Sequence, residues 1–326
     1  MEIENTKFFW APTIMWEVTP EGELKIENII LKDDIVTLFP KFYFLTQDGI
    51  TLENLHEEFK DYSAHKLEKF IQMLKRERFL VDHIQRIDDL FYRQADLYEQ
   101  YNRYDESIRF EEKKLEDFVE EQLSRKKVFG KKEILLLPSE TNQMLWRERK
   151  SVRSFNTEQK ITFTQFSDGL EVLRQYKEGE KRRYYYPSAG GLYPIDVYIY
   201  VKPDRIENVS QGLYYYDSCR NQLQMVSDET FDKDIHYFSN QNIFASSACS
   251  VYFIYHADAS MPKYEDRAIF YAIIDAGIMA ETLTMRLEEI GIGSCIIGEM
   301  NFEKIAEAFE LSKNETFLFN MEFGLK

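Results

Sequence analysis

The chain has 326 residues, of which 44% are hydrophobic and 15% aromatic, enough to bury a sizeable core in a globular protein of two domains. Its 41 Lys and Arg against 57 Asp and Glu give a net charge of −16, which argues against nucleic acid as a partner. No apolar run approaches the roughly 18–20 residues that span a bilayer, and the N-terminus is acidic where a signal peptide is basic. We therefore expect a cytoplasmic protein without membrane contact.

Cysteine and histidine usage argues against a metal or a disulfide framework. Cys219, Cys249 and Cys295 form no C-x-x-C pair, and the five histidines are scattered without metal-ligand spacing. Cys219 and Cys295 are also expected to be inert, because no histidine is paired with either in sequence. The sequence predicts no metal site.

Residues 1–83 have the pattern of a small winged-helix-like domain. The strands expected there are Ile14–Val18, Glu23–Leu31 and Phe39–Leu45. Two helices follow, Leu52–Phe59 capped by Thr51 and Lys66–Phe79 capped by Ser63. This domain has no basic recognition helix. A packing module or partner-binding unit and a peptide-capturing domain are both compatible with the pattern.

Residues 84–140 are rich in Glu, Lys, Arg and Tyr, and the part before Gly130 contains neither glycine nor proline. We expect a charged helical linker there. A lid over the catalytic cleft is the alternative interpretation.

From residue 141 to 326 strands and helices alternate irregularly, which predicts an α+β domain with a mixed sheet flanked by helices. A long helix is expected at Glu265–Ile290, ended by Gly291, because apolar residues recur there at three-four spacing. From the residues alone this helix is a buried core helix within one chain. The remaining expected elements are helices at Phe166–Tyr176 and Asn301–Leu311 and strands at Asp196–Val201, Gly212–Tyr216, Gln222–Val226, Cys249–His256 and Thr316–Phe323.

Two motifs in this domain carry chemistry. Arg149-Lys150-Ser151-Val152-Arg153-Ser154-Phe155 has the cations and hydroxyls of a phosphate-binding segment, since guanidinium groups form charge-assisted hydrogen bonds with phosphate. Tyr184-Tyr185-Tyr186-Pro187-Ser188-Ala189-Gly190-Gly191-Leu192-Tyr193-Pro194 is a glycine-bearing turn before a strand. Its glycines allow a flat ligand to approach the backbone closely. By themselves, a solvated basic helix end and an ordinary tight turn explain the same residues.

Together the two motifs resemble the nitroreductase superfamily, and within it the azoline oxidases, the streptolysin-type (SagB/ThcOx) dehydrogenases of peptide natural-product assembly. The resemblance covers roughly residues 141–326. It implies FMN as the cofactor, with its phosphate at Arg149, Ser151 and Arg153. The residues that it places along the flavin ring are Pro187, Ser188, Ala189, Gly190, Gly191, Ile297 and Gly298, with Ile296 as a further neighbour.

The same resemblance assigns catalysis to Lys263 and Tyr264, which follow a buried strand and precede the long helix. In azoline oxidases a lysine-tyrosine pair at this place is implicated in proton abstraction. Desolvation of an ammonium lowers its pKa, so a lysine there could act as a base beside a relaying phenol. The resemblance also implies a homodimer across the long helix.

The function implied is oxidation of thiazoline or oxazoline rings to thiazoles or oxazoles in a ribosomally made precursor peptide. Cyclodehydratase subunits of a biosynthetic complex are the implied partners. The alternatives are a generic nicotinamide-fed nitroreductase, and a non-catalytic scaffold that keeps the flavin fold for dimerisation. The Lys-Tyr pair and the N-terminal domain argue against the first alternative, and the intact motifs argue against the second.

Overall fold

The computed structural model describes residues 6–32, 34–90, 106–125 and 144–326. The chain divides into two compact units, Met1–Leu90 with Met144–Lys326, and Phe91–Gln143. In the second unit the described elements are a 3₁₀ turn, η1 (Glu106–Arg109), and α6 (Glu112–Ser124), a helix with no buried residue. The other parts of the predicted helical linker, 91–105 and 126–140, lie outside the described residues.

The N-terminal residues build a core of their own around packed aromatic rings. Trp10 packs edge to face on Phe39 with ring centroids 5.4 Å apart, and Phe42 packs on Phe70 at 5.1 Å. The strands form two sheets with the orders β5-β1-β6 and β2-β3-β4. The elements are β1 (Lys7–Trp10), β2 (Trp16–Val18), β3 (Leu24–Ile26), β4 (Ile29–Leu31), α1 (Asp34–Gln47), β5 (Ile50–Thr51), α2 (Leu52–Glu58), α3 (Ala64–Arg76), β6 (Leu80–Val81) and α4 (Ile87–Leu90).

Three local predictions in this part are wrong. The expected strand Glu23–Leu31 is a hairpin of β3 and β4, with a φ of 49° at Glu27 between them. The expected strand Phe39–Leu45 lies inside helix α1, where Phe39 and Phe42 are buried and Phe44 is 76% exposed. Burial at a spacing of three residues requires a helix, whereas a strand would bury every second residue. Ser63 forms no side-chain cap on α3, while Thr51 caps α2 by accepting a hydrogen bond from the N–H of Asn54, as predicted.

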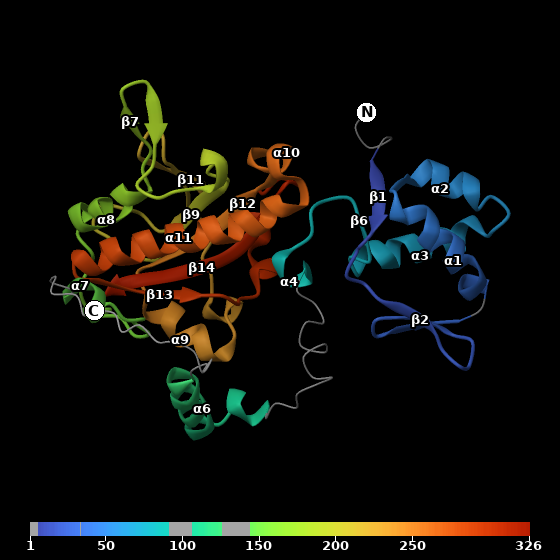
Figure 1. The fold of residues 1–326 in the computed structure, drawn as a ribbon, viewed down its shortest axis with the longest axis horizontal. Helices are drawn as coiled ribbons and strands as arrows, with labels where there is room; N and C mark the ends of the chain where they lie inside the picture. The colour runs from blue at the N-terminus through green and yellow to red at the C-terminus, as the bar shows by residue number, and fades with distance from the viewer. Residues whose placement is uncertain (1–5, 33, 91–105, 126–143) are drawn as a thin grey trace, which may run out of the picture. The chain divides into compact units, whose positions relative to one another are not determined.

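The C-terminal part is built on a six-stranded sheet with the order β11-β10-β9-β12-β14-β13 (Figure 1). Its strand pairs are antiparallel, and a parallel bridge between Ser151 and Ser294 makes it mixed at the β13 edge. The α+β class predicted from the sequence is confirmed. The strands are β9 (Ile195–Val201), β10 (Gly212–Asp217), β11 (Gln222–Ser227), β12 (Cys249–His256), β13 (Ile292–Ile297) and β14 (Glu315–Leu325), and a separate hairpin consists of β7 (Tyr176–Glu178) and β8 (Lys181–Arg183).

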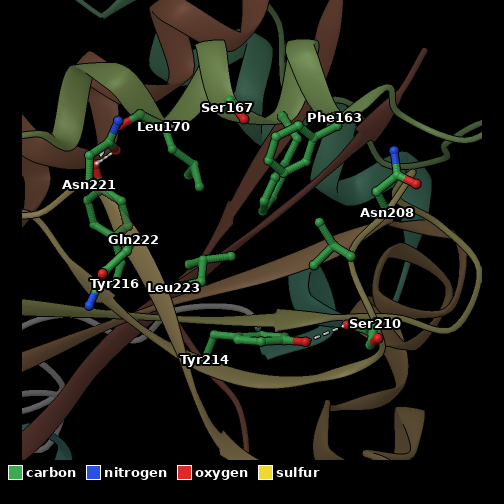
Figure 2. Close-up of a pocket in the computed structure, with 12 residues that line it drawn as sticks. Phe163, Ser167, Leu170, Asn208, Ser210, Tyr214, Tyr216, Asn221, Gln222 and Leu223 are labelled. Atoms are coloured by element: carbon green, nitrogen blue, oxygen red, sulfur yellow. Dashed lines mark hydrogen bonds between the residues drawn. The ribbon is translucent and has the colours of Figure 1, made fainter.

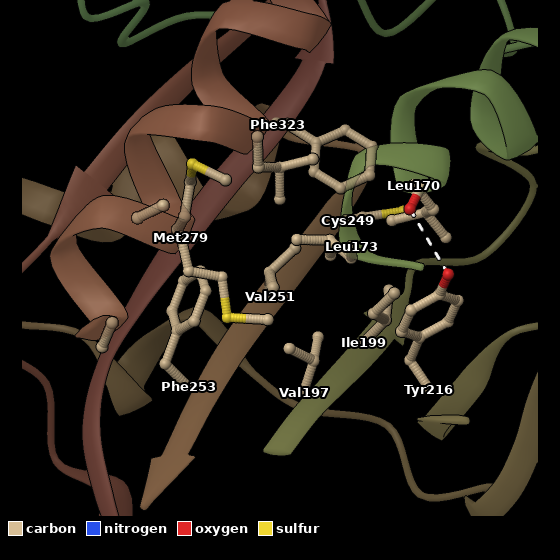
Figure 3. Close-up of a cluster of buried hydrophobic side chains, with 14 of the residues drawn as sticks. Leu170, Leu173, Val197, Ile199, Tyr216, Cys249, Val251, Phe253, Met279 and Phe323 are labelled. Atoms are coloured by element: carbon tan, nitrogen blue, oxygen red, sulfur yellow. Dashed lines mark hydrogen bonds between the residues drawn. The ribbon is translucent and has the colours of Figure 1, made fainter. Parts of the chain in front are cut away.

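Helix α11 (Ala268–Glu289) covers one face of this sheet together with α8 (Phe163–Leu170) and the turn η2 (Glu171–Leu173). Met279 from α11, Leu170 from α8 and Phe253 from β12 meet in the main core cluster (Figure 3). The opposite face is covered by α9 (Phe238–Ser246) and the short 3₁₀ turns η4 (Lys233–Ile235), η7 (Phe302–Lys304) and η8 (Ala306–Phe309).

The last predicted helix, Asn301–Leu311, is wrong, because this stretch contains only the two turns η7 and η8. Ile305 departs from helical geometry between them, and Glu310 has the left-handed φ of 51°. The long helix begins at Ala268 and not at Glu265, because Glu265 itself has a φ of 50°. Gly291 follows the end of the helix with a φ of 81°, the conformation predicted for it.

One described stretch, Met261–Glu289, is long and apolar enough to cross a membrane by length and composition. The sequence-based expectation that no apolar segment approaches the length of a membrane span overlooked this stretch. In its most apolar window 44% of the residues are buried inside the protein. Core helices pass the same test, and the α11 residues Ala272, Ala276 and Ala280 are fully buried. The stretch is therefore part of the protein core.

Candidate active site

The glycine turn is held in place by a buried carboxylate on α11. Asp275, which is 5% exposed, accepts a hydrogen bond from the Ser188 hydroxyl at 2.5 Å. It also accepts one from the backbone N–H of Ala189, at 3.1 Å from each carboxylate oxygen. The Ser188 hydroxyl in turn accepts from the N–H of Tyr193 at 2.9 Å. Asp275 thus connects the core helix to the predicted flavin turn.

The two glycines of the turn are exposed and left-handed, with φ values of 63° for Gly190 and 69° for Gly191. A Cβ atom on Gly190 would lie 2.5 Å from Lys263 Nζ and 2.4 Å from the Tyr264 hydroxyl. The structure therefore brings the predicted catalytic pair directly onto the predicted flavin turn. Gly191 has open space at the corresponding position.

Lys263 and Tyr264 end the short helix α10 (Met261–Tyr264). Lys263 Nζ lies 5.1 Å from the centroid of the Tyr264 ring, which packs edge to face on Tyr271 at 5.0 Å. The Tyr264 side chain is half-buried, whereas Lys263 is exposed. The surrounding chain therefore does not shield the Lys263 ammonium from water, contrary to the expectation from the sequence. A bound molecule would have to exclude that water.

The predicted phosphate segment follows α7 (Met144–Glu148) and runs beside β13. The N–H of Val152 donates to the carbonyl of Ser294 at 2.9 Å, and Val152 fills the space above Gly293. Ser151 and Arg153, on either side of Val152, are exposed. Among the described residues, the guanidinium groups of Arg149 and Arg153 form no hydrogen bond or ion pair with protein. Both cations are thus available to an anion.

The phosphate segment and the glycine turn are anchored to the same helix but do not contact each other. Asp275 holds the turn, and Thr284, nine residues later on α11, lies with its hydroxyl 3.5 Å from that of Ser294. At 1.5 Å per residue, the two anchor points are about 13 Å apart along the helix.

The end of β13 presents Ile296 to solvent and buries Ile297. Ile297 is 3% exposed and packs with Phe155, Ile243 and Cys295, whereas Ile296 is 46% exposed. Side chains alternate along a strand, so Ile296 points to the same side as Ser294. Gly298 is exposed, with open space where a side chain would be. If this strand end contacts a flavin, the available side chain is that of Ile296.

A cavity of about 480 Å³ lies elsewhere, between α8, the loop around Asn208 and the β10–β11 hairpin (Figure 2). Its floor consists of apolar and aromatic side chains, among them Phe163, Tyr214 and Leu223. No charged side chain and none of the predicted site residues is among those that line it. A phosphate-bearing cofactor requires cations, so this cavity is not the predicted cofactor site.

Sequence reasoning missed Asp275. A signal existed, because this acidic residue occupies the apolar stripe of the long helix between Ala272 and Met279. A charged residue at a core-facing position must have a partner, and here the partner is the turn.

The sequence and the fold are similar to those of known proteins. The model of the Nitroreductase family matches residues 146–325, more than half of the chain. The chain belongs to the nitroreductase family. A stretch of 128 residues is 23% identical to the "Putative nitroreductase MJ1384" of Methanocaldococcus jannaschii, covering 39% of this chain and 64% of that protein.

A solved structure has the same fold. A chain of the Escherichia coli microcin synthetase McbBCD complex, with truncated pro-MccB17 bound, superposes with a TM-score of 0.52 at 16% identity. The match covers 82% of this chain and 96% of that one. A "putative nitroreductase" of Ralstonia eutropha matches 59% of this chain and 87% of its own length, at 22% identity and a TM-score of 0.46.

The buried carboxylate leads to a prediction about stability. Asp275→Ala removes the acceptor for the Ser188 hydroxyl and the Ala189 N–H, so the free energy of unfolding should fall by about 1.5–3 kcal/mol. Urea denaturation measures this change. Asp228→Ala, at an exposed acidic residue outside α11, is the control and should change stability by less than about 0.5 kcal/mol. Equal effects of the two substitutions would show that Asp275 does not anchor the turn.

Proposed function

We propose that this chain is an FMN-dependent dehydrogenase that oxidises thiazoline or oxazoline rings to thiazoles or oxazoles in a ribosomally made peptide. The observation that carries the proposal is the meeting of Lys263 Nζ and the Tyr264 hydroxyl over Gly190. A proton acceptor next to the predicted flavin turn suits an enzyme that removes a proton and a hydride from adjacent carbons. The microcin synthetase complex of the same fold holds a pro-peptide, and we extend that type of substrate to this chain.

The residues of the candidate site fit FMN. Gly190 and Gly191 are exposed, and neither carries a side chain that would keep a flat ring from the backbone. Arg149, Ser151 and Arg153 would hold the phosphate, since both guanidinium groups lack a described protein partner. FMN, once bound, supplies the hydride acceptor that a two-electron oxidation needs.

Lys263 and Tyr264 supply the proton chemistry in this proposal. Aromatisation of an azoline removes two hydrogens from neighbouring ring carbons, and the chain must accept one of them as a proton. Lys263 in its neutral form accepts that proton at Nζ, and the Tyr264 hydroxyl orients or relays it. Both groups lie over Gly190, and the proposal puts the substrate on this side of the turn.

A homodimer belongs to the proposal, because α11 carries an uncovered apolar strip. Phe270 is 60% exposed and Ile274 44% exposed, and Gly277, one turn further on, has open space around it. These positions recur every three or four residues on one helix face, opposite the core face. We place a second copy of the chain against this strip, as the family resemblance implies.

The N-terminal domain is proposed to capture the leader of the precursor peptide, beside cyclodehydratase subunits. Strand β4 has only β3 as a neighbour in its sheet, so its outer edge can accept another strand. A cavity of about 320 Å³ lies between this edge and α3, where the apolar Leu31, Ile35, Phe70 and Met73 are flanked by Lys32, Asp34, Lys66 and Lys69. Apolar side chains of an added strand would fill it.

Purified protein should contain bound FMN at about one molecule per chain and be yellow. Arg149→Ala and Arg153→Ala should each weaken FMN binding by about 1.5–3 kcal/mol, because each removes a charge-assisted hydrogen bond. Fluorescence titration of the apoprotein measures the affinity. Lys150→Ala, in the same segment, is the control and should bind FMN normally. Protein that takes up no FMN would refute the proposed cofactor.

The catalytic assignment predicts that Lys263→Ala and Tyr264→Phe keep FMN but lose azoline oxidation. A positioned general base contributes roughly 10²–10⁴-fold to rate. Mass spectrometry of an azoline peptide follows the loss of two hydrogens per ring. Full activity in both variants would contradict the assignment.

Two glycine variants provide a matched control for this site. Gly190→Ala and Gly191→Ala both place a side chain at a left-handed φ, so each should lower stability by about 1–2 kcal/mol. Only the methyl group on Gly190 would displace Lys263 Nζ and the Tyr264 hydroxyl. Oxidation should therefore fall further in Gly190→Ala, whereas equal losses would indicate that backbone strain alone matters.

Leader capture predicts that Met73→Asp weakens binding of the full precursor peptide at least about tenfold, because a charge replaces one of the apolar side chains of the groove beside β4. Fluorescence polarisation with a labelled precursor measures this affinity. Val18→Asp, on the strand at the other edge of the same sheet and 50% exposed, is the control. Unchanged affinity in Met73→Asp would remove the groove from the proposal and leave a packing role for the domain.

A further inference from the structure

We propose that Asp196, His256 and Glu315 form a binding site for one divalent transition-metal ion, with zinc as the ion that the donor set suits best. The three residues come from β9, β12 and β14, which are neighbours in the large sheet. Each is half-buried, and each offers a ligand atom within 4.8 Å of those of the other two. None of the three residues belongs to the proposed cofactor-binding set or to the proposed catalytic pair.

The spacing of the donor atoms suits a small cation. Asp196 Oδ2 lies 3.3 Å from His256 Nδ1. Tetrahedral zinc with bonds of about 2.0–2.2 Å to nitrogen and oxygen holds its ligand atoms roughly 3.3–3.5 Å apart. His256 and Glu315 are directly paired residues of β12 and β14, so a small rotation of the glutamate side chain brings its oxygen to the same spacing.

Each of the three side chains is also held from behind by a second polar group. Tyr215 donates its hydroxyl to Asp196 Oδ1 at 3.3 Å, which leaves Oδ2 toward the histidine. The N–H of Ser312 donates to Glu315 Oε2 at 2.7 Å, which leaves Oε1. His256 Nε2 lies 3.6 Å from Asp258, which itself accepts a hydrogen bond from the Asn314 side chain at 3.0 Å.

The hydrogen bonds to Asp196 and Glu315 match those found around metal-binding carboxylates, while Asp258 lies near His256 at a distance longer than a hydrogen bond. A ligating histidine donates its other ring N–H to a carboxylate or carbonyl, and the ligating carboxylates are themselves hydrogen-bonded. Such partners fix the tautomer and the orientation of each ligand. A surface group of acidic residues without a ligand has no need for this second layer.

The local charge favours a cation. Among the described residues, neither Asp196 nor Glu315 forms an ion pair with a lysine or arginine. A metal ion would neutralise this concentration of negative charge.

The donor set narrows the choice of metal. One imidazole with two carboxylates is typical of zinc and of other first-row divalent ions, whereas calcium and magnesium prefer oxygen ligands alone. Three protein ligands leave at least one coordination position for water. We therefore expect zinc to bind more tightly than magnesium or calcium.

The place of the site in the fold gives it a positioning role. Asp196 follows Pro194, the last residue of the glycine-turn motif, by two residues, and the N–H of His256 donates to the Pro194 carbonyl at 2.9 Å. From His256 the chain continues through η5 (Ala257–Ala259) to α10, which carries Lys263. A metal ion would tie together the two segments that meet at Gly190.

The test uses the complete chain without a histidine tag, stripped of metal by a chelator and titrated with ZnCl₂ in a calorimeter. We expect saturable binding of one ion per chain. His256→Ala, Asp196→Asn and Glu315→Gln should each weaken zinc binding by tenfold or more. Asp258→Asn, which changes only the second layer, should weaken it by roughly 10–100-fold.

His83→Ala is the matched control. The His83 side chain is 42% exposed and lies 3.0 Å from Asp82, much as His256 is 40% exposed beside Asp196, but no third ligand joins that pair among the described residues. Zinc affinity should be unchanged in this variant. The proposal is overturned if the unmodified chain shows no saturable zinc binding, or if the three ligand variants bind zinc as the unmodified chain does.

Discussion

The negative charge of a carboxylate buried on the core face of an apolar helix needs hydrogen-bond donors, and in this protein the glycine turn supplies them. Asp275 accepts hydrogen bonds from the Ser188 hydroxyl and the Ala189 N–H, which fixes the turn against the core. Leaving such a charge without partners would cost several kcal/mol, so the turn has little freedom to move away. Gly190 is thereby held where Lys263 and Tyr264 reach it.

Helix α11 supports both motifs of the nitroreductase family. Its core face packs on the sheet, Asp275 binds the glycine turn, and Thr284 lies against Ser294 beside the phosphate segment. The exposed side of the same helix carries Phe270 and Ile274. One rigid element therefore fixes the spacing between the two segments and carries exposed apolar side chains on its other side.

The proposed metal site shows how sequence spacing can hide a cluster. Asp196, His256 and Glu315 are separated by about 60 residues each, so the chain order contains no metal-ligand pattern. They come together only because β9, β12 and β14 are neighbours in the sheet, and because the starts of β9 and β14 lie beside the end of β12. The strand order, which depends on long-range pairing, creates the site.

By itself the sequence determined the α+β class, the long helix, its Gly291 terminus and the two family motifs, because hydrophobic periodicity and glycine conformation are local properties. The strand at Cys249–His256 was predicted to the residue for the same reason. The tertiary structure alone decided that Phe39–Leu45 is helical, that Asp275 is the anchor of the turn, and that Ile296 rather than Ile297 is exposed. Each of these depends on which face meets the core, and that is settled by packing between residues distant in the chain.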